Sequence, residues 1–145
     1  MFTLSDRDLD PALLGRAMAH PRAGALSTFE GWVRNHHAGR GVLRLAYETY
    51  DQLALKEGDR VLAAARARFD IIDARCVHRI GPLDVGGLAI WIGVTAEHRA
   101  PALEACEFII DAVKATVPVW KKEFYTDGST AWVNCAHESS VAEHK

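Results

Sequence analysis

The chain has 145 residues, of which 49% are hydrophobic and 25% are charged, and its formal net charge is −2. These values are typical of a folded globular protein and exclude the disordered and fibrous classes. The near-neutral charge excludes a chain-wide attraction to nucleic acid or to an acidic membrane surface, so any anion site requires a local basic cluster.

Residue patterns before position 50 predict one short helix and two strands. Asp10-Pro11 is typical of an N-cap followed by proline at the first helical position, and it predicts a helix through about residue 19. Residues 24–34 predict a strand because they are rich in β-branched and aromatic side chains, and alternation over residues 42–50 predicts a second. We expect these strands to pair as a hairpin across the polar loop Asn35–Gly41.

The second of these strands leads into a longer predicted helix. Leu43, Leu45 and Tyr47 alternate with polar residues, so we expect them to point to one side of the strand. Residues 51–69 then predict a helix with apolar residues on one side. Gly58 weakens that helix by about 1 kcal/mol relative to alanine.

The next segment predicts two strands and a third helix. Strands are expected over residues 74–80 and 88–95, with GPLDVGG between them interpreted as a turn. Residues 100–117 predict a helix whose apolar stripe, at three- to four-residue spacing, begins at Leu103. Pro118 ends the helix because it lacks an N–H group and restricts the residue before it.

A final hairpin completes the predicted elements, with strands over residues 121–125 and 131–134 around Thr126-Asp-Gly-Ser. Strands and helices mix without strict βαβ alternation, so we predict an α+β fold with an antiparallel or mixed sheet and about three helices. No internal repeat or linker is evident, and we interpret residues 1–145 as a single domain.

Cysteine usage and the N-terminus indicate the cellular compartment. Cys76, Cys106 and Cys135 form no C-x-x-C pair, and their odd number argues against a disulfide framework. The N-terminus has acidic residues where a signal peptide has basic ones, and no apolar run approaches the roughly 18 residues that span a bilayer. We therefore expect a cytoplasmic protein with reduced thiols.

Basic residues surround the end of the third predicted helix. Lys114 lies on the flank of the apolar stripe, and Pro118 turns the chain back so that Lys121 or Lys122 approaches the same place. Two interpretations remain open at this point. The lysines are either ordinary cations at the negative end of a helix dipole, or a pair that serves an anion as acid/base or nucleophilic groups.

Two other basic clusters are candidate anion sites. Arg34 ends a predicted strand, and its planar guanidinium suits a phosphate or carboxylate, although a solvated hairpin loop is the alternative. His98 and Arg99 precede the third helix, whose free backbone N–H groups can help to hold an anion. The more usual role of residues at that position is exposed capping.

Histidine and cysteine patterns give no metal site. Cys76-Val-His78 and Cys135-Ala-His137 lack the spacing of zinc ligands, so we expect no bound metal. His78-Arg79 lies within a strand and is interpreted as structural, with one of the two side chains at the surface because neighbouring residues of a strand point to opposite faces.

Four motifs occur in order along the chain: F-x-G-x-V-R-N-H (Phe29–His36), H-R-I-G (His78–Gly81), G-V-T-x-x-H-R (Gly93–Arg99) and K-x-x-x-P-x-W-K-x-E (Lys114–Glu123). Together they resemble the large, catalytic subunit of molybdopterin synthase, the MoaE family, over about residues 24–134. The resemblance implies an α+β fold of the α/β-hammerhead type.

The resemblance also implies a sulfurtransferase reaction. Enzymes of this family convert cyclic pyranopterin monophosphate into molybdopterin by installing two dithiolene sulfurs. The sulfur arrives as a thiocarboxylate on the C-terminal Gly-Gly of a small ubiquitin-like partner, whose tail enters a pocket of the large subunit. Two large subunits form a central homodimer within a heterotetramer, and no cofactor or metal is needed. Because the present sequence ends without Gly-Gly, we expect that it is not the sulfur carrier.

By position, Lys114 and Lys121 match the family's two active-site lysines, and Arg34, His98 and Arg99 match residues associated with substrate binding. A cyclic phosphate requires cationic donors, and lysines can supply the proton transfers and anion stabilisation of sulfur transfer. The division of roles between the two lysines is left open. Two other functions also remain open, a non-catalytic scaffold that binds the pterin phosphate or the partner and a hydrolase of cyclic phosphates.

Overall fold

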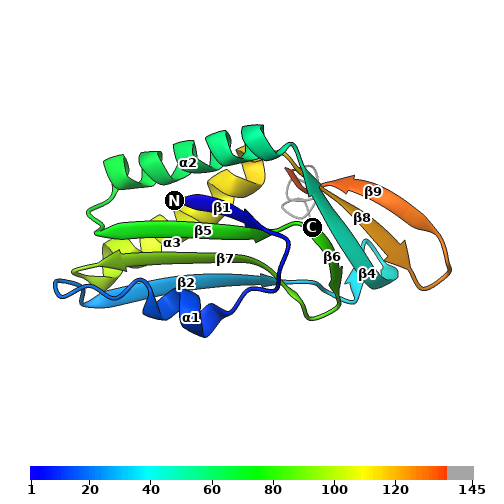
Figure 1. Ribbon diagram of the computed structural model, residues 1–145, viewed down its shortest axis with the longest axis horizontal. Coiled ribbons are helices and arrows are strands. Elements are labelled where there is room, and N and C mark those ends of the chain that lie inside the picture. The colour runs from blue at the N-terminus through cyan, green and yellow to red at the C-terminus, as the bar shows by residue number, and fades with distance from the viewer. Residues whose placement is uncertain (137–145) are drawn as a thin grey trace.

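The computed structural model describes residues 1–136, which form three helices and two sheets (Figure 1). The elements in chain order are β1 (Phe2–Ser5), α1 (Pro11–Arg16), β2 (Ala25–Trp32), β3 (His36–His37), β4 (Arg40–Thr49), α2 (Asp51–Arg68), β5 (Asp73–Arg79), β6 (Gly81–Asp84), β7 (Leu88–Ala96), α3 (Arg99–Thr116), β8 (Val119–Tyr125) and β9 (Thr130–Asn134). The segment 137–145, which includes His137 of the Cys135-Ala-His137 pattern, lies outside the described residues.

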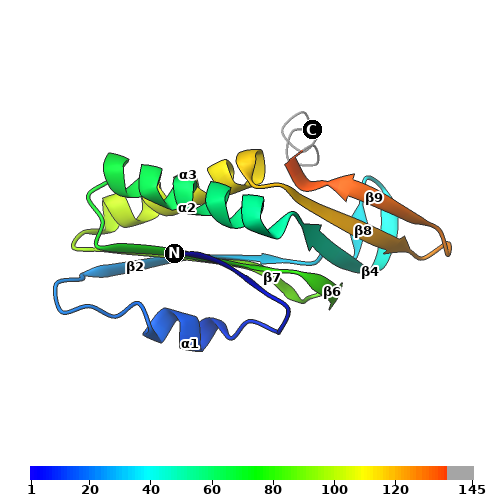
Figure 2. The ribbon, with the colours of Figure 1, turned by 45° about the horizontal axis from the view of Figure 1, so that its top comes forward.

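The first sheet has the strand order β1-β5-β7-β2, with β1 parallel to β5 and the other pairs antiparallel. Helices α2 and α3 cover one face, and α1 lies against the other (Figure 2). Because both faces are covered, every residue of β7 from Ala89 to Ala96 is buried. Thr95 of β7 donates a hydrogen bond from its hydroxyl to the Met18 carbonyl at 3.0 Å, which fixes the segment after α1.

The core lies between this sheet and its two long helices. Phe2 of β1 packs directly over Gly58 of α2, and a Cβ atom at position 58 would lie 2.1 Å from Cγ of the Phe2 ring. The glycine that weakens the helix in isolation therefore allows the first strand to approach it closely. No helix within residues 1–136 is long and apolar enough to cross a membrane.

The second sheet is built around β4, which pairs antiparallel with β8 on one side and with β6 and β3 along its length. Strand β9 pairs with β8 as the predicted hairpin. This sheet lies at one end of the first one (Figure 1). The prediction of an α+β fold with three helices and mixed or antiparallel sheets is confirmed.

The predicted hairpin between residues 24–34 and 42–50 is wrong. Strand β2 pairs instead with β7, from Ala25 opposite Ala96 onwards, while β4 belongs to the second sheet. Strand β2 pairs with the buried β7 along its whole length. The predicted hairpin with residues 42–50 does not form. The tight hairpin joins β3 to β4, and its turn residues Ala38 and Gly39 have φ angles of 51° and 79°.

Besides β3, which lies in the predicted loop Asn35–Gly41, two strands escaped the sequence patterns. The GPLDVGG segment contains β6, which pairs with β4, and only its last residues form the turn, with Gly86 at a φ of 85°. Strand β1 lies within the first five residues and has a parallel partner in β5. Both strands are short, and each is stabilised by a partner far away in the sequence, so local alternation carries little signal for them.

Leu43 and Leu103, both expected on an inner face, are exposed. Leu43 is 53% exposed because the register of β4 against β8 shifts between Val42 and Arg44, which turns Leu43 outwards. Leu103 is 59% exposed on α3, since the helix buries the neighbouring Ala102 and Cys106 instead.

Replacing Gly58 by alanine tests the close approach of β1 to α2. We expect G58A to destabilise the protein by about 1–3 kcal/mol, since the new methyl group meets a ring that is already packed. Urea denaturation followed by circular dichroism measures the change.

Gly15→Ala in α1 is the matched control, because its Cβ would meet only Leu26 Cδ2 at 3.8 Å. That variant should be unchanged or more stable by about 0.5–1 kcal/mol. Equal effects of the two substitutions would contradict the packing role of Gly58.

Candidate active site

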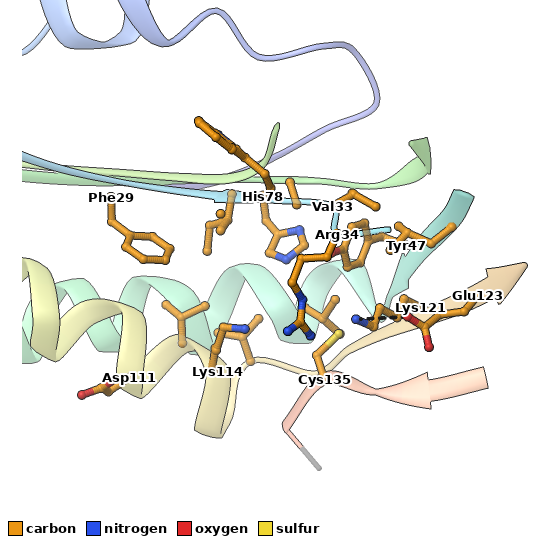
Figure 3. Close-up of a pocket in the computed structure, with 18 of the residues that line it drawn as sticks. Phe29, Val33, Arg34, Tyr47, His78, Asp111, Lys114, Lys121, Glu123 and Cys135 are labelled. Atoms are coloured by element: carbon orange, nitrogen blue, oxygen red, sulfur yellow. Dashed lines mark ion pairs between the residues drawn. The ribbon is translucent and has the colours of Figure 1, made fainter. Parts of the chain in front are cut away.

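A cavity of about 500 Å³ opens where the end of α3 meets both sheets (Figure 3). Its apolar wall comes mainly from β2, β7 and the segment around Pro118. Its polar side chains come from segments far apart in the sequence: Arg34, His36, Tyr47, His78, Asp111, Lys114, Lys121, Glu123 and Cys135. Such a volume suits a small organic ligand.

Three of the five predicted site residues line this cavity. Arg34 lies two residues after the end of β2, and Lys114 lies in the last turn of α3. Helix α3 ends before Pro118, and β8 begins directly after it, which returns Lys121 to the same cavity. The predicted turn at the helix end is therefore confirmed, and Figure 3 shows the three cationic side chains reaching into one space.

The alternation of β8 separates the two neighbouring lysines. Lys121 is 8% exposed and lies on the inner face of the strand, in the cavity lining. Lys122 points to the opposite face, where its ammonium lies 5.4 Å from the centre of the Phe124 ring. Lys121, and not Lys122, is therefore the partner of Lys114 in the cavity.

A buried carboxylate stands beside Lys121. Glu123, two residues further along β8, is only 2% exposed, and its Oε2 lies 3.5 Å from Lys121 Nζ. Its Oε1 accepts hydrogen bonds from His37 Nδ1 at 2.7 Å and from the Tyr125 hydroxyl at 3.0 Å. Sequence reasoning did not single out Glu123, although its two-residue spacing from Lys121 in a strand already puts both side chains on one face.

The β3–β4 hairpin contacts β8 beside Lys121 and Glu123. Besides the bond from His37 to Glu123, the Arg40 guanidinium lies 3.6 Å from the centre of the Tyr125 ring. Arg40 also forms an ion pair with Asp127 at 3.3 Å. The segment Asn35–Gly41, expected to be a loop, is therefore attached to β8 and to the turn after it.

His78 and Arg79 are both buried, so the expectation that one of them reaches the surface is wrong. At the junction of β5 and β6 the Arg79 guanidinium turns inwards and donates to the carbonyls of Ile80 and Pro82, each at 2.9 Å. His78 points into the cavity, and its Nδ1 donates to the Arg79 carbonyl at 2.7 Å. The ring also meets Tyr47 edge to face, with centroids 4.9 Å apart.

The environment of His78 favours the neutral imidazole. Burial lowers the pKa of His78 to about 4, against the bond to the Arg79 carbonyl, which favours the charged form. The nearby Lys114 ammonium lowers the pKa further. His78 is therefore an uncharged polar group among cations at neutral pH.

His98 and Arg99 do not lie at this cavity. His98 is the N-cap of α3 and Arg99 its first residue, and both are exposed. Arg99 stands 15 residues before Lys114 on one straight helix, which separates the two by about 22 Å at 1.5 Å per residue. The structure therefore brings Arg34, Lys114 and Lys121 together and leaves the other two predicted residues at the far end of α3.

The cysteines and the acidic residues form no metal centre in the part of the chain that the structure describes. Cys76 and Cys106 are free thiols. Cys76 and Cys106 are buried, and burial raises the pKa of both thiols. Cys135 lines the cavity.

Known proteins are similar to this chain in sequence and in fold. A family model described as MoaE protein matches residues 4–116. Molybdopterin synthase catalytic subunits from Pyrococcus abyssi and Arabidopsis thaliana are 47% and 44% identical over 110 and 108 residues. The aligned parts cover 76% and 74% of this chain, but 74% of the Pyrococcus protein and only 54% of the Arabidopsis protein.

Solved structures agree with the sequence matches. A molybdopterin synthase structure from Staphylococcus aureus superposes with a TM-score of 0.84 at 29% identity, covering 90% of this chain and 94% of that one. A molybdopterin biosynthesis MoaE protein from Burkholderia ambifaria gives 0.78 at 30% identity and covers 99% and 96% of the two chains.

The lowered pKa of His78 predicts a pH dependence of stability. The unfolded chain binds the proton at a pKa of about 6.5 and the folded chain at about 4, so stability is present above pH 6.5 and is lost as the pH falls towards 4. The loss amounts to at most about 3 kcal/mol. Urea unfolding at several pH values measures the free energy of unfolding as a function of pH. In His78→Asn this free energy should fall less between pH 6.5 and 4 than in the unmodified protein. Parallel curves for both proteins would contradict the buried, neutral imidazole.

Proposed function

The chain belongs to the MoaE protein family, and we propose that it is the catalytic subunit of a molybdopterin synthase. In this proposal it transfers sulfur from the C-terminal thiocarboxylate of a small ubiquitin-like partner to cyclic pyranopterin monophosphate, which yields the dithiolene of molybdopterin. The observation that carries the proposal is the convergence of Arg34, Lys114 and Lys121 on one cavity.

The cavity offers a suitable environment for a cyclic phosphate. Three cationic side chains face a space whose other wall is apolar, so a ligand with one anionic end and one flat organic end finds a partner for each part. We assign Arg34 to the phosphate, because a guanidinium can donate two parallel hydrogen bonds to it. Arg34 is exposed at the mouth of the cavity, where a phosphate can reach it without full dehydration.

The two lysines differ in their surroundings, and we assign them different roles. Lys114 is exposed on α3, so an incoming thiocarboxylate tail can reach it, and there it acts as acid/base or electrostatic stabiliser. Lys121 is buried beside Glu123, which holds its ammonium in one place. A fixed ammonium is suited to stabilise the charge that develops during sulfur transfer or phosphate departure.

His98 and Arg99 enter the proposal through a second copy of the chain. The length of α3 keeps them from the cavity of their own chain, while the family resemblance associates both with substrate binding. We therefore assign them to the cavity of the partner copy in a homodimer. The site of one copy is then completed by the helix N-terminus of the other.

Reconstitution tests the proposed reaction directly. The purified chain is mixed with a thiocarboxylated small subunit and with cyclic pyranopterin monophosphate, and the products are identified by mass spectrometry. A dithiolene product is expected. Opening of the cyclic phosphate without sulfur incorporation would show a hydrolase instead, and binding without any conversion would show a scaffold.

Lys114→Ala should reduce dithiolene formation by at least about 100-fold, because the variant loses a positioned acid/base group at the reacting atoms. The fold should persist, since the Lys114 side chain is exposed and lies outside the core. Lys122→Ala is the matched control, because Lys122 lies on the opposite face of β8 and should keep near-normal rates. Near-normal turnover of the Lys114 variant would refute its assignment.

A further inference from the structure

Among the polar groups of the cavity to which the sulfur-transfer proposal gives no role is the imidazole of His78. It reaches from β5 into the space that Arg34 and Lys114 also enter (Figure 3). The side chain is 7% exposed, so it cannot rearrange freely. Buried polar atoms are normally hydrogen-bonded, so each of the two ring nitrogens of His78 is expected to have a partner.

The tautomer of the ring follows from its hydrogen bond. Nδ1 lies 2.7 Å from the Arg79 carbonyl, and a carbonyl oxygen only accepts, so Nδ1 must carry the hydrogen. In the neutral ring Nε2 then has a lone pair and no hydrogen. The edge-to-face contact with Tyr47 holds the plane of the ring. Among residues 1–136 no group pairs with Nε2, which is directed to the cavity on the side away from Nδ1.

This acceptor stands out from its neighbours. Arg34, Lys114 and Lys121 can only donate hydrogen bonds. Glu123 is already bonded within the protein, and Asp111 lies at the outer end of the cavity (Figure 3). The cavity therefore places the neutral acceptor of His78 among cationic donors.

We propose that His78 is a substrate-binding and specificity-determining residue, whose unprotonated Nε2 accepts a hydrogen bond from an N–H or O–H group of the bound ligand. The ligand class is then an anion that also carries a donor on its organic part. The inference rests on the proposed function, because cyclic pyranopterin monophosphate is such a ligand, with ring N–H groups beside a phosphate. A ligand that presents a carbonyl oxygen at this place meets a lone pair and is disfavoured.

Nitrogen NMR of the protein labelled with ¹⁵N-histidine tests the inference on the unmodified site. In the free protein at neutral pH the His78 signals should show a protonated Nδ1 and an unprotonated Nε2, and their loss in His78→Asn identifies them. Addition of cyclic pyranopterin monophosphate should move the Nε2 signal in the direction of an accepted hydrogen bond. Sulfate, which has the charge but no donor, should leave the signal in place.

A pair of variants provides a second readout. Asparagine places its amide nitrogen near the position of Nδ1 and keeps the bond to Arg79, but it has no acceptor at Nε2. Glutamine places an amide oxygen near Nε2. We expect His78→Asn to weaken binding of the cyclic pterin about tenfold by calorimetry, and His78→Gln to restore most of the affinity.

Three results would overturn the inference: a protonated Nε2 in the free protein, a cyclic pterin that binds while Nε2 stays unchanged, or equal shifts with sulfate. Failure of the sulfur-transfer proposal is recognised separately, by the absence of dithiolene in the reconstituted reaction. The tautomer and the binding signal of His78 can be read in either case.

Discussion

The buried carboxylate of Glu123 is the interaction on which the geometry of the cavity depends. Burying an ionised carboxylate without partners costs several kcal/mol, and its position is stable only because its oxygens are occupied. His37 and Tyr125 donate to one oxygen, and the ammonium of Lys121 faces the other. The β3–β4 hairpin and strand β8 are thereby held together, and Lys121 is held between the hairpin and the cavity.

The cavity itself lies at the seam between the two sheets, at the places where the chain passes from one layer to the other. The first passage follows β2 and leaves Arg34 at the seam. The second joins β5 to β6, where Arg79 donates to the carbonyls of Ile80 and Pro82 and His78 lines the cavity. The third joins α3 to β8 and brings Lys114 and Lys121 together. The site is thus a consequence of how the two sheets are connected.

The parts of the fold that depend on local signals could be predicted from the sequence. Apolar spacing and Pro118 fix the limits of α3, and the lysines beside them follow from that turn. Strand β6 could not be predicted, because its partner β4 lies over 30 residues earlier in the chain. The role of Glu123 likewise depends on His37, 86 residues away. Arg34 was a candidate from its position at the end of a predicted strand, whereas the placement of His98 and Arg99 required the observed length of α3.

The central claim, that Glu123 acts on the reaction through Lys121, is tested most directly by a double-mutant cycle on kcat/KM for dithiolene formation. Glu123→Gln keeps an acceptor for His37 but removes the charge beside the ammonium, and Lys121→Ala removes the ammonium itself. We expect the double variant to be no slower than Lys121→Ala alone, because each substitution already disrupts the same Lys121–Glu123 pair. The claim would be contradicted if the fold-loss of kcat/KM in the double variant equalled the product of the losses in the two single variants.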